Sequence, residues 1–370
     1  MKIPAFDLTR STARLQEPLG RRWAELVASA GFIGGPEVAR FESELASYLG
    51  AAGCVGVANG TDALVVALRA LDLQPGDQVI VPAFTFIATG SAVALAGGVP
   101  VFADVEPGSL NLDPASVEER ITDRTAGVIG VHLFGRPCDV EALAALCRRH
   151  GIWLIEDAAQ AHGATVGRRR AGTFGTLGSF SFYPTKNLGA FGDGGAVIGD
   201  DPDLLDRVRR IANHGRTEHY LHGELGTNSR LDALQAAVLN LRLQELDAGN
   251  RRRREIAARY RETLEPFDAV DLPRDADGTE PVYHQFALLT DRRDALREHL
   301  AERGIGSVVF YPIPLHRQPA LAPYVPEGLS LPVSERAAER VLSPPMFPEL
   351  EDAEVEEVRR ALGEFFSDAR

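Results

Sequence analysis

The sequence has little cysteine and fewer basic than acidic side chains. Only Cys54, Cys138 and Cys147 occur among its 370 residues, and no two of them form a C-x-x-C pair. An odd number of widely spaced cysteines does not suggest a disulfide framework, so a reduced, cytoplasmic setting is expected. Lysine and arginine together number 39 against 52 aspartates and glutamates, which gives a formal net charge of −13. That charge argues against a non-specific nucleic-acid partner, because such binding neutralises phosphates with basic side chains.

The chain also has no clear export or membrane segment. Its first residues, MKIPAFDLTR, contain no apolar core of the kind that signal peptides have. Residues 79–103 carry no charge and are long enough to cross a bilayer, but prolines and glycines such as Pro82, Gly90 and Pro100 interrupt them. We interpret this stretch as a strand (QVIVP), a short helix of small residues and a second strand (VPVFADV). A buried β-α-β unit is therefore expected, and no membrane partner.

Strand-like and helix-like patterns alternate over the first two-thirds of the chain. AGVIGVHLF and IWLIED predict strands, and VEALAALCRRHG predicts a helix that ends at its glycine. Strands that are apolar throughout and alternate with helices are typical of an α/β protein with a mostly parallel sheet. Past Asp232 we expect one or two long helices, then short strands (HQFALLT, SVVFYP) and further helices. This predicts a large domain, residues 1–245, and a smaller α+β C-terminal domain, residues 246–370.

The segment GSFSFYPTKNLGAFGDGGAV, residues 178–197, carries the most information about chemistry. Its first half alternates, which places Phe180 and Phe182 on one face of a strand and Ser181 on the other. The strand is expected to end at Pro184, so that Lys186 lies in a loop. A lysine among apolar and small residues is partly desolvated, its pKa falls, and its neutral amine can form a Schiff base. A lysine between glycines is, taken alone, more often an ordinary surface residue.

Two other stretches contain side chains and N–H groups that could belong to the same binding site as Lys186. Asp157 ends the strand IWLIED at the sheet edge where ligands bind, where a carboxylate can keep a pyridinium nitrogen protonated. It can equally cap the segment that follows. Gly60 and Thr61 begin a predicted helix and offer N–H groups and a hydroxyl to a phosphate, although any capped helix does so. Phe86 can stack on a pyridine ring or pack in the core.

In their order and spacing these motifs resemble the DegT/DnrJ/EryC1/StrS family of sugar aminotransferases. The matching stretches run from about residue 30 to 350 and include NGTDALVVALRAL, IEDAAQAHGA, FSFYPTKNLGAFGDGGAV, TNSRLDALQAAVL and YPIPLH. The resemblance implies the type I, aspartate-aminotransferase-like fold of pyridoxal 5'-phosphate (PLP) enzymes and a homodimer with shared active sites. It also implies transfer of an amino group from L-glutamate to a nucleotide-linked keto-sugar. The Lys186 segment is most similar to members that act on 3-keto sugars.

The resemblance further implies roles for single residues. Lys186 is expected to form the Schiff base with PLP and to move the substrate proton, while Asp157 pairs with the pyridine nitrogen. The other expected cofactor contacts are Gly60, Thr61, Phe86, Gln160, Ser181 and Asn228 of the partner subunit. The expected substrate contacts are Arg230 of the partner subunit, Tyr311 and His316. For the arginine a salt bridge between subunits, and for the histidine a turn contact, remain equally open; no metal site is predicted.

Other functions also fit parts of the sequence. Family members with histidine in place of the lysine act as sugar dehydratases, so Lys186 favours transamination over dehydration. A PLP-dependent dehydratase and a non-catalytic regulator on the same scaffold are the alternatives. The basic run at residues 251–254 lies in a predicted helix with acidic neighbours, which favours a solvated face over a binding site. GDGGAV lacks the G-x-G-x-x-G spacing of a dinucleotide loop and precedes a strand.

Overall fold

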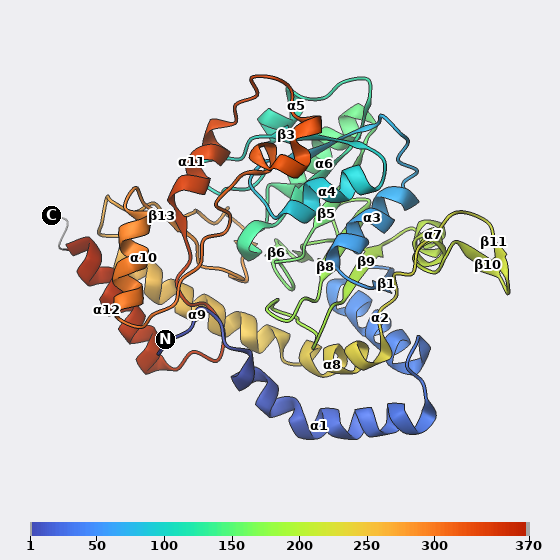
Figure 1. Cartoon of the computed structure of the whole chain (residues 1–370), viewed down its shortest axis with the longest axis horizontal. Helices are drawn as coiled ribbons and strands as arrows, with labels where there is room; N and C mark the ends of the chain where they lie inside the picture. The colour runs from blue at the N-terminus through green and yellow to red at the C-terminus, as the bar shows by residue number, and fades with distance from the viewer. Residues whose placement is uncertain (1, 368–370) are drawn as a thin grey trace.

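A seven-stranded sheet forms the centre of the molecule, which a computed structural model describes over residues 2–367 (Figure 1). The strand order is β1-β9-β8-β5-β4-β2-β3, and only β9 runs antiparallel to its neighbours. The mostly parallel sheet expected from the sequence is therefore confirmed. Its strands are β1 (Gly53–Val57), β2 (Gln78–Pro82), β3 (Val99–Ala103), β4 (Thr125–Val131), β5 (Trp153–Asp157), β8 (Leu177–Ser181) and β9 (Gly195–Gly199).

Helices cover both faces of this sheet. They are α2 (Gly35–Leu49), α3 (Gly60–Ala70), α4 (Ile87–Leu95), α5 (Pro114–Glu118), α6 (Val140–His150), α7 (Pro202–Ala212) and α8 (Ala233–Leu243). Successive side chains of a strand point to opposite faces, so a sheet covered on both sides needs strands that are apolar throughout. In β5, Ile155 belongs to the apolar cluster of α3, α4 and α7, whereas Leu154 belongs to that of α5 and α6.

A second apolar cluster lies beside the sheet and is built mainly by C-terminal helices. It combines side chains of α9 (Leu246–Leu264), α10 (Arg293–Glu302) and α12 (Asp352–Ser367), and it includes Ile3 from the start of the chain. The long helical stretch expected after Asp232 is two helices, α8 and α9, which meet at residues 244–245. The division into residues 1–245 and 246–370 falls at this junction and stays a prediction.

The strands expected in the C-terminal part are much shorter than the alternation indicated. HQFALLT forms only β13 (Leu288–Leu289), which pairs with β14 (Val341–Leu342), and SVVFYP contributes a single bridge between Val308 and Ser343. Their apolar side chains are buried in two separate clusters. The alternation along the sequence therefore reflects packing on both sides of an extended segment that forms few hydrogen bonds to a neighbouring strand. The remaining elements are α1 (Leu8–Ser29), β6 (Thr165–Val166), β7 (Arg169–Arg170), β10 (Arg216–Glu218), β11 (Leu221–His222), β12 (Thr279–Glu280), α11 (Pro332–Arg340) and the 3₁₀ turns η1 (Leu133–Gly135), η2 (Leu315–Arg317) and η3 (Pro319–Tyr324).

Two elements extend from this body. Helix α1 lies along its lower edge in Figure 1, beside α8, and the hairpin of β10 and β11 projects to the right. Tyr220 at the tip of the hairpin is 86% exposed, and Leu225 just after it is 85% exposed. Large apolar side chains at the end of a projecting hairpin have no packing role within their own chain.

The uncharged stretch of residues 79–103 lies within the sheet and its covering helices. It spans β2 from its second residue, α4 and β3, which is the β-α-β unit that its prolines and glycines predicted. Among the described residues, no helix is both long enough and apolar enough to cross a membrane. The three cysteines are free and buried.

The central position of β5 leads to a stability prediction. We expect Ile155→Ala to lower the free energy of unfolding by about 2–5 kcal/mol, because a fully buried side chain is replaced by a cavity. Leu95→Ala is the matched control: it removes the same number of atoms from a side chain that is 69% exposed. We expect it to change stability by less than about 0.5 kcal/mol. Urea denaturation measures both, and equal losses would contradict the buried position of β5.

Candidate active site

Lys186 lies in a tight turn directly after β8. Its backbone N–H donates to the carbonyl of Tyr183 at 2.8 Å. Just before the turn, the N–H of Phe182 donates to the carbonyl of Gly194, and the carbonyl of Phe182 accepts from the N–H of Ala190. The turn is compact enough to require glycine at position 189, where a Cβ atom would lie 2.4 Å from the carbonyl oxygen of Pro184. The strand ends at Ser181, three residues before the expected break at Pro184, and Lys186 lies in a turn as predicted.

Lys186, which is half-buried, and Asp157, which is buried, influence each other's charge. Burial lowers the pKa of the Lys186 amine to about 8, and the Asp157 carboxylate opposes that shift. Burial also raises the pKa of Asp157, against which the Ala159 N–H group, the Thr89 hydroxyl and Lys186 all act. An amine with such a pKa has a substantial neutral fraction near physiological pH, which nucleophilic addition to a carbonyl requires.

Both carboxylate oxygens of Asp157 are held by hydrogen bonds. Oδ1 accepts from the N–H of Ala159 at 3.2 Å, and Oδ2 accepts from the hydroxyl of Thr89 in α4 at 3.0 Å. The residue therefore caps its own turn, as one interpretation expected. Its expected pairing with a pyridine nitrogen stays a prediction. Thr89 was not singled out from the sequence. The only signal it gave was a hydroxyl inside an otherwise small and apolar helix.

A group of hydrogen-bond donors gathers where α3 begins. Asn59 caps the helix by accepting from the N–H of Asp62 at 2.8 Å, which leaves the N–H groups of Gly60 and Thr61 without a partner inside the helix. A Cβ atom on Gly60 would lie 2.5 Å from the Cβ of Ser181, so the helix start and the end of β8 touch. The structure thus brings Gly60, Thr61 and Ser181 together, in a cradle suited to an anion.

Phe86, Gln160 and Tyr311 meet on another side of the site. The Gln160 amide donates to the Tyr311 hydroxyl at 3.0 Å and accepts from the backbone N–H of Phe134 at 2.6 Å. The rings of Phe86 and Tyr311 lie 5.9 Å apart. Burial raises the pKa of Tyr311, so its hydroxyl stays protonated. Phe86 begins α4 and is 52% exposed, which favours a role at a ligand surface over core packing.

The residue after the lysine is fixed by a network that the sequence did not indicate. The Asn187 amide donates to Asn250 of α9 at 2.9 Å and to the carbonyl of Val282 at 3.0 Å. Its oxygen pairs with Nδ1 of His284 at 3.2 Å, and Asn250 in turn donates to the carbonyl of His162 at 2.8 Å. The turn that carries Lys186 is therefore bound to the first C-terminal helix.

Three expected site residues have other partners. Arg230 donates to the side chain of Asn213 at 2.7 Å, and Asn228 pairs with Asn213 through the backbone, at the base of the hairpin. His316 bonds to Glu335 at 2.9 Å, and this contact together with Arg317 lowers the pKa of Glu335 to about 2. Within residues 2–367, none of the three forms a hydrogen bond or ion pair with Lys186, Asp157 or Gln160 of the same chain. Their expected ligand roles stay predictions.

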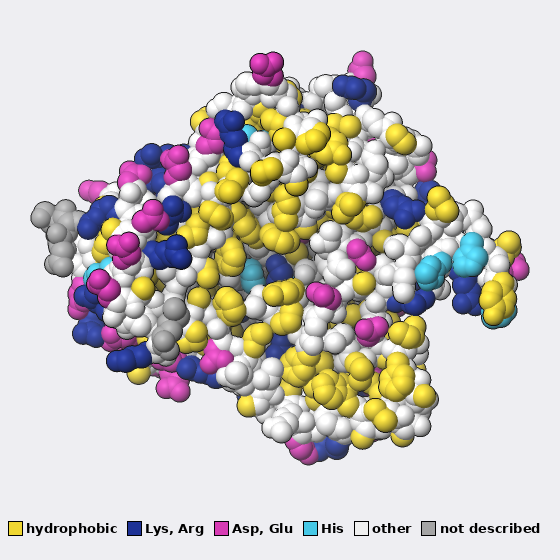
Figure 2. Space-filling view, viewed as in Figure 1, with side chains coloured by type: hydrophobic (Ala, Val, Ile, Leu, Met, Phe, Trp, Pro, Cys, Tyr) yellow, Lys and Arg dark blue, Asp and Glu magenta, His cyan; other side chains and the backbone are white. Residues whose placement is uncertain are grey.

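The surface above the sheet is hollowed. Figure 2 shows a hollow near the middle of this face, with apolar side chains around it. A cavity of about 450 Å³ adjoins the turn of Lys186 and Asn187 and continues towards the start of α1. Arg242 and Arg253 also line it. A space of this size is typical of small-molecule sites. Among the described residues, no group of three or more histidine, cysteine, aspartate or glutamate side chains could hold a metal ion.

Comparison with known proteins assigns the chain to a family. Residues 15–363 match the DegT/DnrJ/EryC1/StrS aminotransferase family. A dTDP-3-amino-3,4,6-trideoxy-alpha-D-glucose transaminase of Streptomyces venezuelae is 46% identical over 95% of this chain and 92% of its own. A "pleiotropic regulatory protein" of Geobacillus stearothermophilus is 43% identical over 99% of both chains. The crystal structure of DesV from S. venezuelae superposes with a TM-score of 0.96 at 45% identity, covering 98% of each chain.

The chain belongs to the DegT/DnrJ/EryC1/StrS aminotransferase family. The type I fold and the PLP cofactor that its sequence predicted are thereby confirmed. The residues fit that cofactor: an amine with lowered pKa, a buried carboxylate that suits a ring nitrogen, and a helix start that contacts Ser181. When bound, PLP supplies an electron sink for the charge that develops on a carbon next to nitrogen.

The charge pair leads to a prediction about pH. In the protein without cofactor we expect reductive methylation of Lys186 to rise with pH around a midpoint near 8, because only the neutral amine reacts. Asp157→Asn should move this midpoint lower still, because the carboxylate now favours the charged amine. Lys2→Arg removes the only other lysine of the chain, and peptide mass spectrometry separates the terminal amine. A midpoint near 10.5 in both proteins would show that Lys186 is not desolvated.

Proposed function

We propose that the chain transfers the amino group of L-glutamate to the keto carbon of a nucleotide-linked sugar, with PLP as carrier. The observation that carries this proposal is the Lys186 amine, whose pKa is lowered to about 8 and which feels the charge of Asp157, at the carboxyl end of a mostly parallel sheet. The name of the S. venezuelae relative, a 3-amino-sugar transaminase, supports a 3-keto sugar as acceptor. The product, an amino-sugar nucleotide, would serve the synthesis of a polysaccharide or a secondary metabolite.

Each residue of the site has a task in this proposal. Lys186 would bind the cofactor and afterwards, as a free amine, take up and return the substrate proton. Asp157, anchored by Thr89, keeps a negative charge beneath the ring nitrogen. Phe86 covers one face of the ring, and Gln160 lies near the 3'-oxygen of the cofactor. The phosphate is held by the cradle of Gly60, Thr61 and Ser181.

The sugar is proposed to enter beside Phe86. Tyr311 contacts both Phe86 and Gln160, which supports a role for its hydroxyl in binding a hydroxyl of the sugar. The diphosphate carries negative charge, for which a guanidinium offers a bidentate partner. Arg230 of the partner subunit is proposed for this role. His316 is engaged with Glu335, which supports its structural alternative over direct contact with substrate.

A homodimer with shared active sites follows from the same proposal. Phe86 and Tyr183 stand beside the cofactor lysine and are 52% and 54% exposed, a large apolar surface for a site that must exclude water. The hairpin of β10 and β11 projects from each subunit with Tyr220 and Leu225 uncovered. A second copy that covers the first site would bring in Asn228 of the partner subunit for the phosphate.

A regulator on the same scaffold is the second candidate, because one relative carries the name of a regulatory protein. The net charge of −13 opposes binding to nucleic acid. A regulator of this kind has no use for a lysine whose pKa is lowered. DNA binding that persists at moderate salt would favour the regulator. Formation of 2-oxoglutarate from glutamate, one equivalent per site, would favour the transaminase over both the regulator and a dehydratase.

Trapping the cofactor tests the enzyme proposal directly. We expect the protein with PLP to absorb in the visible or near-ultraviolet range and to lose that band when L-glutamate is added. In a separate sample without glutamate, borohydride should fix PLP on Lys186 and not on Lys2, the other lysine of the chain, as peptide mass spectrometry can establish. Lys2→Arg is the matched control and should behave like wild type. If Lys186→Ala were indistinguishable from wild type, the proposal would be wrong.

Mixing two inactive variants tests the shared site. We expect Lys186→Ala and Arg230→Ala each to lose activity on the sugar, because each removes a group from every site. If the two groups come from different subunits, a mixed dimer has one intact site, and random mixing restores about a quarter of wild-type activity. Mixing Lys186→Ala with Asp157→Ala is the control. It should restore nothing, because both residues lie in one subunit. Equal results from the two mixtures would contradict the shared site.

A further inference from the structure

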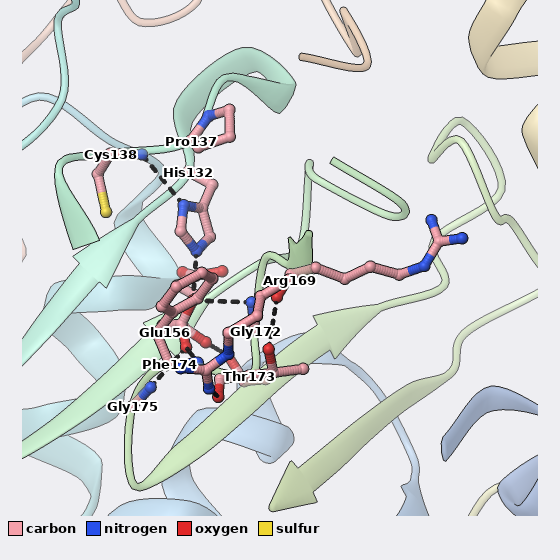
Figure 3. A network of polar contacts seen from close by, with 12 residues as sticks. His132, Pro137, Cys138, Glu156, Arg169, Gly172, Thr173, Phe174 and Gly175 are labelled. Carbon is pink, nitrogen blue, oxygen red and sulfur yellow. Dashed lines mark hydrogen bonds and ion pairs between the residues drawn. The ribbon is translucent and has the colours of Figure 1, made fainter. Parts of the chain in front are cut away.

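A second buried carboxylate, Glu156, lies immediately before Asp157 in β5. Its side chain is fully buried and points to the opposite face of the sheet, because neighbours on a strand alternate. Figure 3 shows it between His132 and the turn of residues 172–175. The proposed reaction gives it no task, and a buried charge needs a full set of partners.

Four donors satisfy this carboxylate. Oε1 accepts from the backbone N–H groups of Phe174 at 2.5 Å and Gly175 at 2.7 Å. Oε2 accepts from the backbone N–H of Gly172 at 2.7 Å and lies 2.9 Å from Nε2 of His132. Three of the donors thus come from one turn and the fourth from the residue that follows β4.

The tautomer of His132 is set by its other nitrogen. Nδ1 lies 3.1 Å from the backbone N–H of Cys138 and accepts from it, so Nδ1 carries no proton. The ring proton is on Nε2, from which it is donated to Glu156. Because both ring nitrogens are committed, His132 cannot become an acceptor towards position 156 without losing the bond from Cys138.

The turn of residues 172–175 approaches the strands too closely for side chains. A Cβ atom on Gly172, where φ is +95°, would lie 2.6 Å from the ring of Phe180, and one on Gly175 would lie 2.5 Å from the carbonyl oxygen of Leu154. At these two positions only glycine fits, which lets their backbone N–H groups reach the carboxylate. Glu156 is therefore the group that binds the turn to β5, and it uses the whole of its carboxylate to do so.

This network meets Asp157 through the backbone. The N–H of His132 donates to the carbonyl of Asp157 at 3.1 Å, and the next N–H, of Ala158, donates to Ser179 of β8 at 2.9 Å. The end of β5 is thus held between β4 and β8, and Glu156 ties the His132 ring to the same strand. A carboxylate must stay within a fraction of an ångström of its partner atom to be useful in catalysis.

We propose that Glu156 is a positioning residue, which, through His132 and the turn of residues 172–175, holds Asp157 in place beneath the ring nitrogen of PLP. The inference rests on the proposed function, since it takes Asp157 as the partner of that nitrogen. The hydrogen-bond network of Glu156 consists of the carboxylate as acceptor, His132 in one tautomer and three backbone N–H donors. Loss of the carboxylate then loosens the end of β5 on the face where Asp157 lies.

Glu156→Gln tests this with almost no change of shape. Its amide nitrogen must face two donors, and the tautomer of His132 cannot relieve this. We expect the absorbance–pH titration of bound PLP to move to higher pH, by up to about one unit, because an unpaired ring nitrogen draws less charge from the Schiff base. Asp157→Asn should move it in the same direction and further. We also expect the dissociation constant of PLP to rise roughly tenfold, as for other residues that orient a ligand group.

Glu42→Gln is the matched control. Glu42 is another largely buried carboxylate, which accepts from the backbone N–H of Gly56 at 2.7 Å. Gly56 lies in β1, an edge strand that β9 and β8 separate from β5. We expect Glu42→Gln to be less stable than wild type and to leave the pH midpoint of the PLP absorbance titration unchanged. If Glu156→Gln only lowered the melting temperature and titrated like wild type, the positioning role would be refuted.

A second pair of variants decides the matter should Glu156→Gln not fold. His132→Gln keeps an N–H donor for the carboxylate, whereas His132→Leu has none. We expect the titration of His132→Gln to lie nearer to wild type than that of His132→Leu, and identical curves would refute the proposal. Absence of any PLP band in wild type would instead refute the proposed function. A normal wild type with unmoved variants would refute the positioning role alone.

Discussion

A half-buried lysine and a buried aspartate influence each other's charge at the carboxyl end of the central sheet, where one lies in a turn and the other ends a strand. Desolvation acts against each charge alone, and the attraction between them offsets part of that cost. The surrounding structure is arranged to maintain this balance. Thr89 and Ala159 hold the carboxylate, and the compact turn closed at Gly189 holds the lysine. The pKa of the amine falls and that of the carboxyl group rises, each against the influence of the other.

Much of the fold could be predicted from the sequence because its signals are local. The apolar strand that ends at Asp157, the helix that begins at Gly60 and the β-α-β unit after Gln78 all depend on short-range periodicity and on capping residues. The C-terminal strands could not be predicted in the same way. The alternation in HQFALLT comes from packing between two clusters, and a pattern of period two does not reveal whether a ladder forms.

The candidate site shows the same limit. Lys186, Asp157, Gly60 and Ser181 stand out by their residue types and by a family pattern, and the structure brings them together. Thr89, Asn187 and Glu156 carry equally specific contacts but could not be identified. Each acts through partners far away in the chain, such as Asn250 for Asn187. Nothing local distinguishes a hydroxyl or an amide with a distant partner from one that faces water.

The single antiparallel strand of the sheet has a consequence for how the site assembles. Because β9 returns beside β8, the turn of Lys186 is closed by neighbours in sequence, and little chain entropy is lost in forming it. Asp157 reaches that turn only when β5 pairs in parallel with β8, a contact across a longer loop and therefore a later one. In folding terms, the lysine turn can form before the charge pair does. If cofactor binding needs both Lys186 and Asp157, PLP binds only after the sheet is complete, and a partly folded chain does not bind it.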